Sequence, residues 1–298
     1  ITKMAPKSRV EVYGLLNDIN YVRARCCAED IYKKCPEKFE EPKTVGMLQF
    51  EWDIYIDAKK RELRGESWQF DEKAISFVDG ELIGGPEDFI LWARQKHNFE
   101  EFRPMPLYVT LTEEGYKGHL NSKNHEYVYL DISIGDEDAG RLVIELFSDR
   151  VPKTCANFKY LCTGEKGTSE ESDYKLAYVN SIFHRIVRNG WIQGGDIYHG
   201  RGNGGESVYG SAFEDENFSV PHDRRGMLGM ANKTRHTNQS QFYITLQPTP
   251  WMDAKYVAFG QVIEGTDTLR KMEMQETMNE RPVADIKIRE CGVLHYEF

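Results

Sequence analysis

The sequence lacks any long hydrophobic run and any excess of positive charge. No apolar stretch approaches the roughly 20 residues that span a bilayer, and the first residues lack the layout of a signal peptide. The 298 residues include 38 Lys and Arg against 48 Asp and Glu, a formal net charge of -10, which argues against a broad nucleic-acid-binding face. We therefore expect a soluble cytoplasmic protein that binds neither membrane nor nucleic acid.

Motifs for metals, disulfides and nucleotide cofactors are also missing. The eight histidines show no metal-ligand spacing. The glycine-rich stretch "GRGNGGESVYG" lacks the strand-turn-helix setting of a dinucleotide loop. The few cysteines are scattered in a way that suggests neither a zinc site nor a disulfide framework: Cys26, Cys27, Cys35, Cys155, Cys162 and Cys291. We expect no metal and no cofactor.

Residues 1–101 have the pattern of a small α/β domain. Alternation in "RVEVYGLL" predicts a strand, and a charged helix-like segment follows from about Asp18 to Lys34. "TVGMLQF" predicts a second strand, and the next segment predicts a helix ending at Gly65. Asp79-Gly80 indicates a hairpin turn, and Pro86 is placed to begin the following helix. The predicted order is β-α-β-α-β-β-α.

The stretch "AISFVDGELIGGPEDFILWARQ" resembles the C-terminal part of thioredoxin and glutaredoxin-like domains. Redox activity in such a domain needs Cys-x-x-Cys after the first strand, where this chain reads "LLNDIN". Cys26 and Cys27 lie on a predicted helix and are interpreted as ordinary thiols, and Ala74 lies near the place of the usual proline. We interpret residues 1–101 as a binding or structural module. Residues 102–126, with weak periodicity and several turn formers, predict a linker.

The second half of the chain, residues 127–298, has the pattern of an antiparallel β domain. Val128, Leu130, Ile132 and Ile134 alternate with more polar residues, and "GDEDAG" separates them from the alternating "RLVIELF", which predicts a hairpin. "VPKTCANFKYLCTG" predicts a helix with Pro in its first turn and Gly at its end. Short strands separated by glycine-rich turns follow and favour closure into a barrel.

Eight segments of this half resemble the cyclophilin family, in the same order: "GRLVIELFSDRVPKTCANFKYLCTGEKG", "FHRIV", "IQGGD", "FEDENF", "GMLGMAN", "TNQSQFYIT", "WMDAKYVAFGQVIEG" and "ECGVL". They cover nearly all of residues 127–298. The resemblance implies an eight-stranded antiparallel barrel capped by two helices, one beginning near Pro152 and one near "GTDTLRKMEM". It also implies prolyl cis-trans isomerase activity.

Rotation about an X-Pro bond must overcome a resonance barrier of about 18–20 kcal/mol. At the twisted transition state the proline nitrogen regains a lone pair, so a cationic donor aimed at it stabilises the transition state more than the ground state. The resemblance assigns that role to Arg185. It implies that Gln193 and Gln241 orient the arginine and hold the peptide backbone. Three more positions are implied to bind substrate: Ala231, Asn232 and Trp251.

The predicted proline pocket departs from the family. Gly190 stands for the usual Phe and Trp191 for the Met after it. Four more positions differ: Tyr243 for a second Phe, Met252 for Leu, Tyr256 for the rim His, and Lys233 for a small residue. Loss of an aromatic wall at position 190 would open a void. Either the Gly190-Trp191 pair repacks into a new pocket, or the indole plugs the old one.

Two functions follow from these observations. One is a cyclophilin-like protein that turns over X-Pro bonds weakly or not at all and acts as a protein-binding scaffold. The alternative is an active isomerase that uses Arg185 on exposed X-Pro bonds. In both, the partners are proteins or peptides. A cytoskeletal assembly such as a ciliary axoneme, with its microtubule components as partners, is one setting that the resemblance allows.

Overall fold

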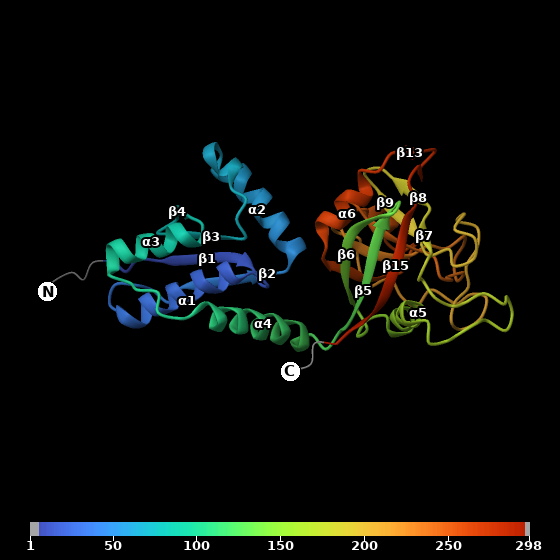
Figure 1. Ribbon diagram of the computed structural model, residues 1–298, viewed down its shortest axis with the longest axis horizontal. Helices are drawn as coiled ribbons and strands as arrows, with labels where there is room; N and C mark the ends of the chain where they lie inside the picture. Colours follow the sequence, from blue (N-terminus) through green and yellow to red (C-terminus); the bar gives the residue numbers. More distant parts are fainter. Residues whose placement is uncertain (1–5, 296–298) are drawn as a thin grey trace. The chain divides into compact units, whose positions relative to one another are not determined.

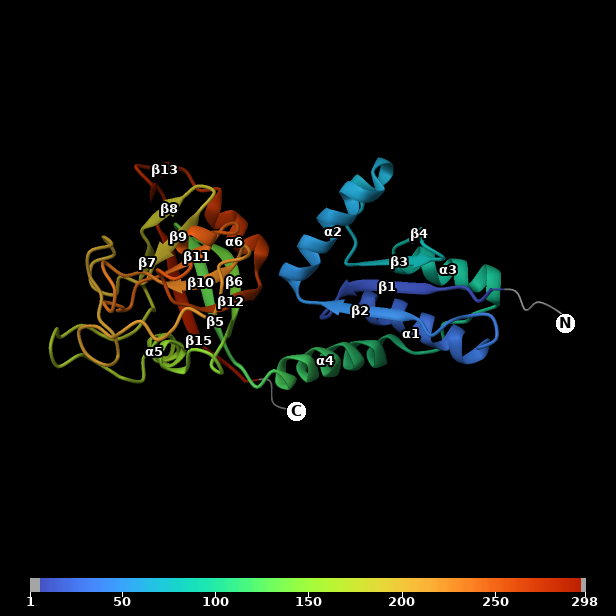
Figure 2. The same cartoon turned by 180° about the vertical axis from the view of Figure 1, so that it is seen from behind.

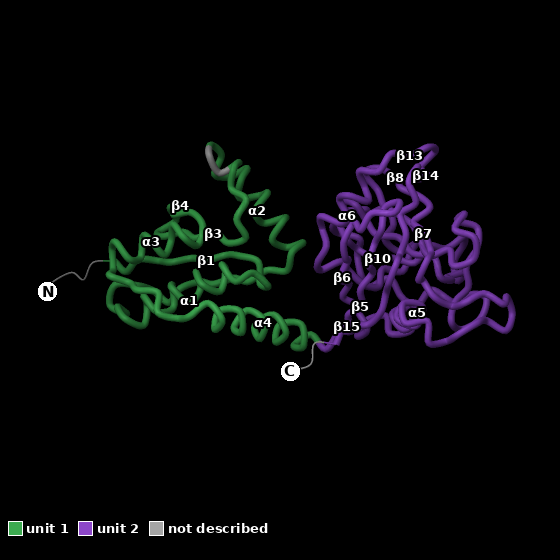
Figure 3. The backbone as a smooth tube through the Cα atoms, in the orientation of Figure 1, with its two compact units in different colours: residues 1–123, 297–298 green, residues 124–296 purple. Residues whose placement is uncertain are grey.

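The computed structural model describes residues 6–295, except for the side chains of residues 66 and 67. The chain divides into two compact units, residues 1–123 with 297–298 and residues 124–296 (Figure 3). Within the described residues, no helix is both long enough and apolar enough to cross a membrane.

The first unit contains a four-stranded sheet with the strand order β2-β1-β3-β4. β1 pairs parallel to β2 and antiparallel to β3. The strands are β1 (Val10–Leu15), β2 (Lys43–Met47), β3 (Ala74–Val78) and β4 (Glu81–Gly84). The predicted hairpin is confirmed, because Asp79 and Gly80 join β3 to β4 with φ angles of 51° and 86°. Such left-handed angles are the ones that a two-residue hairpin turn requires.

Helices cover both faces of this sheet. They are α1 (Ile19–Lys34), α2 (Gln49–Leu63), α3 (Pro86–His97) and α4 (Met105–Ser122), and η1 (Gly65–Gln69) is a short 3₁₀ turn. Alternate β3 side chains point to opposite faces. Ala74 and Val78 pack in one core with residues of α1, α3 and α4, whereas Ile75 and Phe77 pack with residues of α2. Figures 1 and 2 show α1 and α2 on different sides of β1. The predicted element order is therefore observed.

Cys26 and Cys27 lie in α1 and are both buried. Burial raises the pKa of each thiol. A raised pKa disfavours the thiolate that redox exchange needs. The two residues therefore have the environment of core side chains.

The segment expected to be a linker is mostly helical. Residues 105–122 form α4, which buries Tyr108, Thr112, Tyr116 and Leu120. These four residues are spaced four apart, so they form one stripe of the helix. Tyr108 belongs to the core that also contains α1 and α3. Because the polar Thr112 occupies one of the four buried positions, the periodicity of the sequence alone was weak.

The second unit contains a nearly closed antiparallel sheet that, in the described residues, has nine strands rather than the predicted eight. Its order is β7-β15-β5-β6-β12-β10-β11-β9-β8. The extra strand arises because "FHRIV" is divided at His184: β7 pairs with β15, and β8 pairs with β9. Both ends of the sheet thus come from one short segment. The strands are β5 (Glu126–Ile134), β6 (Glu137–Leu146), β7 (Ile182–Phe183), β8 (Arg185–Val187), β9 (Trp191–Gly194), β10 (Met227–Met230), β11 (Phe242–Thr245), β12 (Ala258–Glu264) and β15 (Ile286–Leu294).

Two helices lie at opposite ends of this sheet, as Figures 1 and 2 show. They are α5 (Pro152–Thr163) and α6 (Thr266–Glu273), at the two predicted places. Phe158 of α5 packs edge-on against Phe242 of β11, with ring centroids 5.0 Å apart, inside the apolar core. A 3₁₀ turn, η2 (Pro250–Met252), and a small hairpin of β13 (Thr277–Met278) and β14 (Arg281–Pro282) complete the unit.

Candidate functional site

A hollow of about 270 Å³ opens on the second unit where β8, β9 and β11 lie near η2. Nine of the ten predicted site residues line it; the tenth, Gln241, lies behind Gln193. Lys255 also lines it and was not predicted. We call this hollow the groove. Its lining consists of Arg185, Trp191, Gln193, Ala231, Asn232, Tyr243, Trp251, Met252, Lys255 and Tyr256. Gly190 and Lys233 are not among the lining residues.

Strand register brings the central residues together. Arg185 of β8 lies opposite Gln193 of β9, and Gln193 lies opposite Tyr243 of β11. Residues directly opposite one another on adjacent antiparallel strands have neighbouring side chains. The polar residues on β8 and β9 therefore meet the aromatic residue on β11 at one place. Trp251, half exposed, and the buried Met252 come from η2.

One wall of the groove is a chain of side-chain amides. The Nε2 group of Gln193 donates to Oε1 of Gln241 at 2.9 Å, and Nε2 of Gln241 donates to the carbonyl oxygen of Gly204 at 2.7 Å. The indole Nε1 of Trp191 donates to Oε1 of Gln193 at 3.4 Å. Both ends of the Gln193 amide are thus engaged within the protein, which fixes its orientation.

Arg185 contacts two residues that flank this wall. Its Nε donates to Oε2 of Glu280 at 2.7 Å, and the two side chains are 43% and 47% exposed. Its guanidinium carbon lies 5.5 Å from the centre of the Trp191 ring, within the range of a cation–π interaction. The sequence suggested Gln193 and Gln241 as the groups that orient Arg185. In the described residues, its Nε is instead held by a carboxylate from the β13–β14 hairpin.

The backbone at Glu280 is unusual for its residue type. Asn279 and Glu280 form the two-residue loop of the hairpin, with φ angles of 51° and 67°. Asparagine tolerates the left-handed region, and glycine is the preferred second residue of such a loop. A glutamate there costs about 1–2 kcal/mol. An exposed ion pair stabilises a protein by only about 0–1 kcal/mol, so the contact with Arg185 does not offset this cost.

A second, adjoining wall of the groove is aromatic. The rings of Trp191 and Tyr243 meet edge-on with centroids 6.5 Å apart, and those of Tyr243 and Tyr256 meet at 5.9 Å. Gly190 lies in the turn before β9, where its N–H donates to the carbonyl oxygen of Val187 at 3.0 Å. The groove is open and Trp191 is among the residues that line it, so the indole does not fill this hollow.

A buried chain of hydrogen bonds through His222 and Asp253, here called the relay, holds Tyr243 in place. Its hydroxyl lies 2.6 Å from Nε2 of His222, and Nδ1 of His222 lies 2.7 Å from Oδ1 of Asp253. Burial lowers the pKa of His222 although the Asp253 carboxylate acts in the opposite direction. The neutral ring then donates from Nδ1 to Asp253, and its Nε2 accepts a hydrogen bond from the Tyr243 hydroxyl. The relay fixes the position of the Tyr243 ring in the groove.

Gly229 provides the space that the Tyr243 hydroxyl occupies. A Cβ atom at position 229 would lie 2.1 Å from the Tyr243 hydroxyl oxygen. Gly229 and Tyr243 are also directly opposite in the β10–β11 register. A tyrosine therefore fits at position 243 because its cross-strand neighbour has no side chain.

The sequence analysis did not identify Glu280, His222, Asp253 or Gly229. Only Glu280 left a local signal, since Asn-Glu stands at a turn where Asn-Gly is usual. His222 and Gly229 act on Tyr243 across strands and loops that are distant in sequence. Their roles depend on tertiary contacts and have no short motif.

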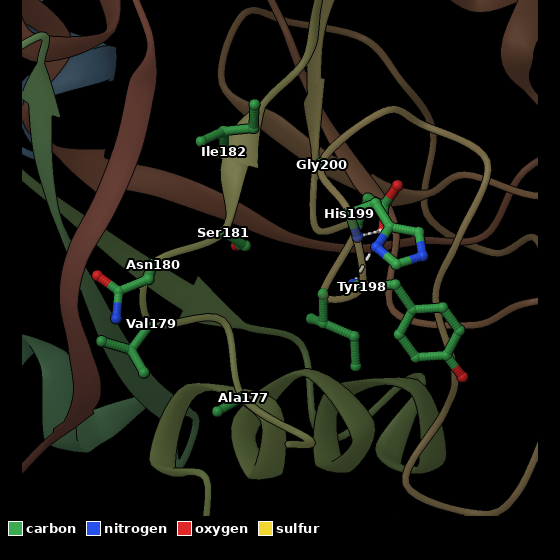
Figure 4. A pocket seen from close by; sticks show the side chains of 10 residues that line it. Ala177, Val179, Asn180, Ser181, Ile182, Tyr198, His199 and Gly200 are labelled. Carbon is green, nitrogen blue, oxygen red and sulfur yellow. Dashed lines mark hydrogen bonds between the residues drawn. The ribbon is translucent and has the colours of Figure 1, made fainter. Parts of the chain in front are cut away.

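A second hollow, of about 330 Å³, lies between residues 177–182 and 196–200 (Figure 4). The carboxylate of Asp196 accepts backbone N–H groups of the loop that follows it, including those of Tyr198 and Gly202. Burial alone would raise the pKa of Asp196, but these hydrogen bonds outweigh it, and the pKa is lowered. This hollow shares no lining residue with the groove.

Among the described residues, no group of three or more His, Cys, Asp or Glu side chains is arranged to hold a metal ion.

Comparison with known proteins gives a family match and several relatives. The model of the family described as "Cyclophilin type peptidyl-prolyl cis-trans isomerase/CLD" matches residues 129–293. A human protein named "Probable inactive peptidyl-prolyl cis-trans isomerase-like 6" is 50% identical over 284 residues, which cover 95% of this chain and 91% of that protein. The mouse protein of the same name is 48% identical over 290 residues, 97% of this chain and 92% of its own.

A third relative matches a shorter part of the chain. The mouse NK-tumor recognition protein is 47% identical over 176 residues, which cover 59% of this chain and 12% of that protein. The two isomerase-like 6 proteins therefore match both units, whereas the NK-tumor recognition protein matches a stretch about the size of residues 124–296.

Proposed function

Because the chain belongs to the cyclophilin family of peptidyl-prolyl cis-trans isomerases, we propose that its groove binds X-Pro segments of protein partners with weak or absent isomerase turnover. The relatives that match almost the whole chain carry the word "inactive" in their names. The family relationship supplies the substrate class. The groove itself supplies the reason for reduced turnover.

The observation that carries this proposal is the position of Trp191. Its indole donates to Oε1 of Gln193 and lies under the guanidinium of Arg185. Catalysis by Arg185 requires the twisted proline nitrogen to reach a free donor in an exact geometry. With an indole forming the wall next to Arg185, a proline ring has to sit differently from the arrangement that the family resemblance implies. The donor is retained, but its alignment with the imide is lost.

Binding is compatible with the same geometry. The groove retains about 270 Å³ of space, and Trp251 at its rim is 52% exposed. An exposed tryptophan at the rim of a binding hollow is a common anchor for a partner protein. In this proposal Ala231, Asn232, Tyr243, Met252 and Tyr256 contact the bound peptide, and Gln193 and Gln241 present the polar wall.

We further propose that residues 1–101 are a thioredoxin/glutaredoxin-like domain without redox activity and that residues 127–298 are the cyclophilin-like domain. The strand order β2-β1-β3-β4, with helices on both sheet faces, supports the first assignment. The segment "LLNDIN" between β1 and α1 has no cysteine. Such a domain presents a surface for protein binding, and the whole chain then acts as a scaffold.

For the setting of this scaffold we propose the cytoplasm, with assembly into cytoskeletal structures such as the ciliary axoneme. The support is the family resemblance, together with the absence of cysteine from "LLNDIN" and the changed pocket residues Gly190 and Trp191. Fluorescence imaging of the tagged chain in ciliated cells tests this proposal. Exclusion of the protein from cilia would contradict the proposed axonemal setting, but not the proposed binding of peptides in the groove.

The alternative is an active isomerase that uses Arg185. It is favoured by the open groove beside the guanidinium. An exchange-NMR assay with an Ala-Pro peptide and the full chain separates the two functions. We expect line broadening or shifts from binding, but no acceleration of cis-trans exchange. Acceleration that is abolished by Arg185→Ala would establish the active enzyme and overturn the proposal.

A second experiment tests the role of Trp191. The double change Gly190→Phe with Trp191→Met restores the residue types that the family resemblance implies, and we expect turnover to appear. A Cβ atom at position 190 would lie 3.1 Å from Cγ1 of Val187, so this side chain has to shift slightly. Gly190→Phe alone is the control. If the double variant binds the peptide but remains inactive, the cause of low turnover is not the Gly190-Trp191 pair.

A further inference from the structure

Glu280 lies in the loop of the β13–β14 hairpin, which contacts β8. Its carbonyl oxygen accepts the N–H of Ile186 at 2.6 Å, and its carboxylate accepts Nε–H of Arg185 at 2.7 Å. Backbone and side chain of the same residue therefore both contact β8. The hairpin is held at the strand that carries the only guanidinium in the groove lining.

The backbone conformation of Glu280 indicates that its contact with Arg185 does not make the folded protein more stable overall. Its φ of 67° belongs to the left-handed region, where glycine is preferred. Strained positions that persist in a fold are often linked to a function of the side chain. The ion pair is too exposed to compensate for the strain. A glutamate at this position is thus better explained by what its carboxylate does to Arg185.

We propose that Glu280 is a positioning residue for Arg185. The Glu280 carboxylate binds Nε of the guanidinium and holds it beside Trp191. It also competes with a bound peptide for the positive charge of Arg185. This inference rests on the proposed function, in which the groove receives X-Pro peptides. Nε can no longer donate to a ligand, so only the terminal Nη groups remain for a peptide oxygen or an imide nitrogen. A guanidinium already paired with a carboxylate gains less from a developing partial charge than a free one.

Other charged groups nearby do not replace this contact. Arg281, the next residue, is exposed, and its Nη2 lies 3.4 Å from the carbonyl oxygen of Gly200. Lys255 is the second cation in the groove lining, and it comes from the segment after η2. Among the described residues, Glu280 is the acidic partner in the one ion pair that Arg185 makes.

The contact can be tested directly by NMR of the full chain, independently of any peptide. The ¹H–¹⁵N signal of Arg185 Nε, assigned with Arg185→Lys, should be shifted and protected from solvent exchange. Glu280→Gly should move it toward the position of a solvated arginine and remove the protection. Glu276→Gln removes an exposed acid of the same segment and should leave the signal unchanged. An Nε signal that is the same in wild type and Glu280→Gly would overturn the proposal.

Competition is tested by titrating the same proteins with an Ala-Pro peptide. Glu280→Gln removes the charge but keeps the side-chain length, and we expect it to bind the peptide about two- to fivefold more tightly, the effect of an exposed ion pair. The gain should vanish when Arg185→Ala is added. Unchanged or weaker binding by Glu280→Gln contradicts the competition. If the wild type and every variant fail to bind, the proposed function of the groove fails, whereas the NMR signal still decides whether Glu280 holds Arg185.

Discussion

The two walls of the groove differ in how they are supported. At the polar wall, Arg185 lines the groove and is paired with Glu280 outside it. Both side chains are nearly half exposed, so water can replace either partner. Tyr243 is 1% exposed, and its hydroxyl depends on His222 and on the space at Gly229. A buried polar atom without a partner is costly, whereas an exposed one is not. The aromatic wall therefore depends on its buried surroundings, whereas the contact between Arg185 and Glu280 can be broken without leaving a buried polar atom unpaired.

Because the two walls differ in burial, substitutions in them should affect different properties. Substitutions in the aromatic wall should destabilise residues 124–296, and substitutions in the polar wall should alter ligand binding while the fold remains. Four experiments test this difference, in order of decreasing expected effect.

The largest effect is expected for Gly229→Ala. The new methyl group would lie 2.1 Å from the Tyr243 oxygen, so Tyr243 has to leave its position. Overpacking of this kind costs about 1–3 kcal/mol. Urea unfolding of the full chain, with hydrogen exchange of the β10 and β11 amides as the local probe, measures the loss. The methyl group would also lie 2.3 Å from Cζ of the ring, so the ring moves in either case and its bond to His222 is lost. Adding Tyr243→Phe should therefore cost less than it does in the wild type; strictly additive effects would show that the two sites are not coupled.

Tyr243→Phe alone should have the next largest effect. It removes the hydroxyl and leaves Nε2 of the buried His222 without its partner, at a cost of about 1–3 kcal/mol. The control is Tyr209→Phe, because the Tyr209 hydroxyl bonds the carbonyl oxygen of Lys153 at an exposed site. Equal losses of unfolding free energy for the two variants would contradict the difference between buried and exposed partners.

Acidification should lower the free energy of unfolding by a smaller amount. Burial lowers the pKa of His184 and of His222 below the ordinary value of 6.5. The unfolded chain therefore binds more protons than the folded chain when the pH falls below 6.5. The stability that these residues contribute is complete above pH 6.5 and is lost as the pH decreases through that value. The urea midpoint of residues 124–296 should be lower at about pH 5.5 than at about pH 7.5, and an equal or higher midpoint would speak against it.

The smallest change in stability is expected for Arg185→Ala. The substitution breaks one exposed ion pair and a cation–π contact, and should alter the unfolding free energy by about 1 kcal/mol or less. Peptide binding in the groove should nevertheless weaken measurably in an NMR titration. A loss of stability as large as that of Gly229→Ala would remove the distinction between the two walls.

Much of the fold was readable because its signals are local. The alternation from Val128 to Ile134 predicted β5, and Pro152 and Gly164 predicted the ends of α5. The count of eight strands was wrong, and most of the segment predicted as a linker, residues 102–126, is helical. The helix α4 buries Thr112 within its stripe, and His184 divides one predicted strand in two. In both places tertiary packing outweighed the local pattern.

The sequence by itself, through its resemblance to the cyclophilin family, identified nine of the ten residues that line the groove and showed that pocket residues differ from that family. Only the tertiary structure decided which partner each side chain has. Glu280 reaches Arg185 across 95 residues, and His222 reaches Tyr243 from a loop outside the sheet. Such pairings depend on distances between segments that are remote in the chain, and no periodicity or short motif encodes them.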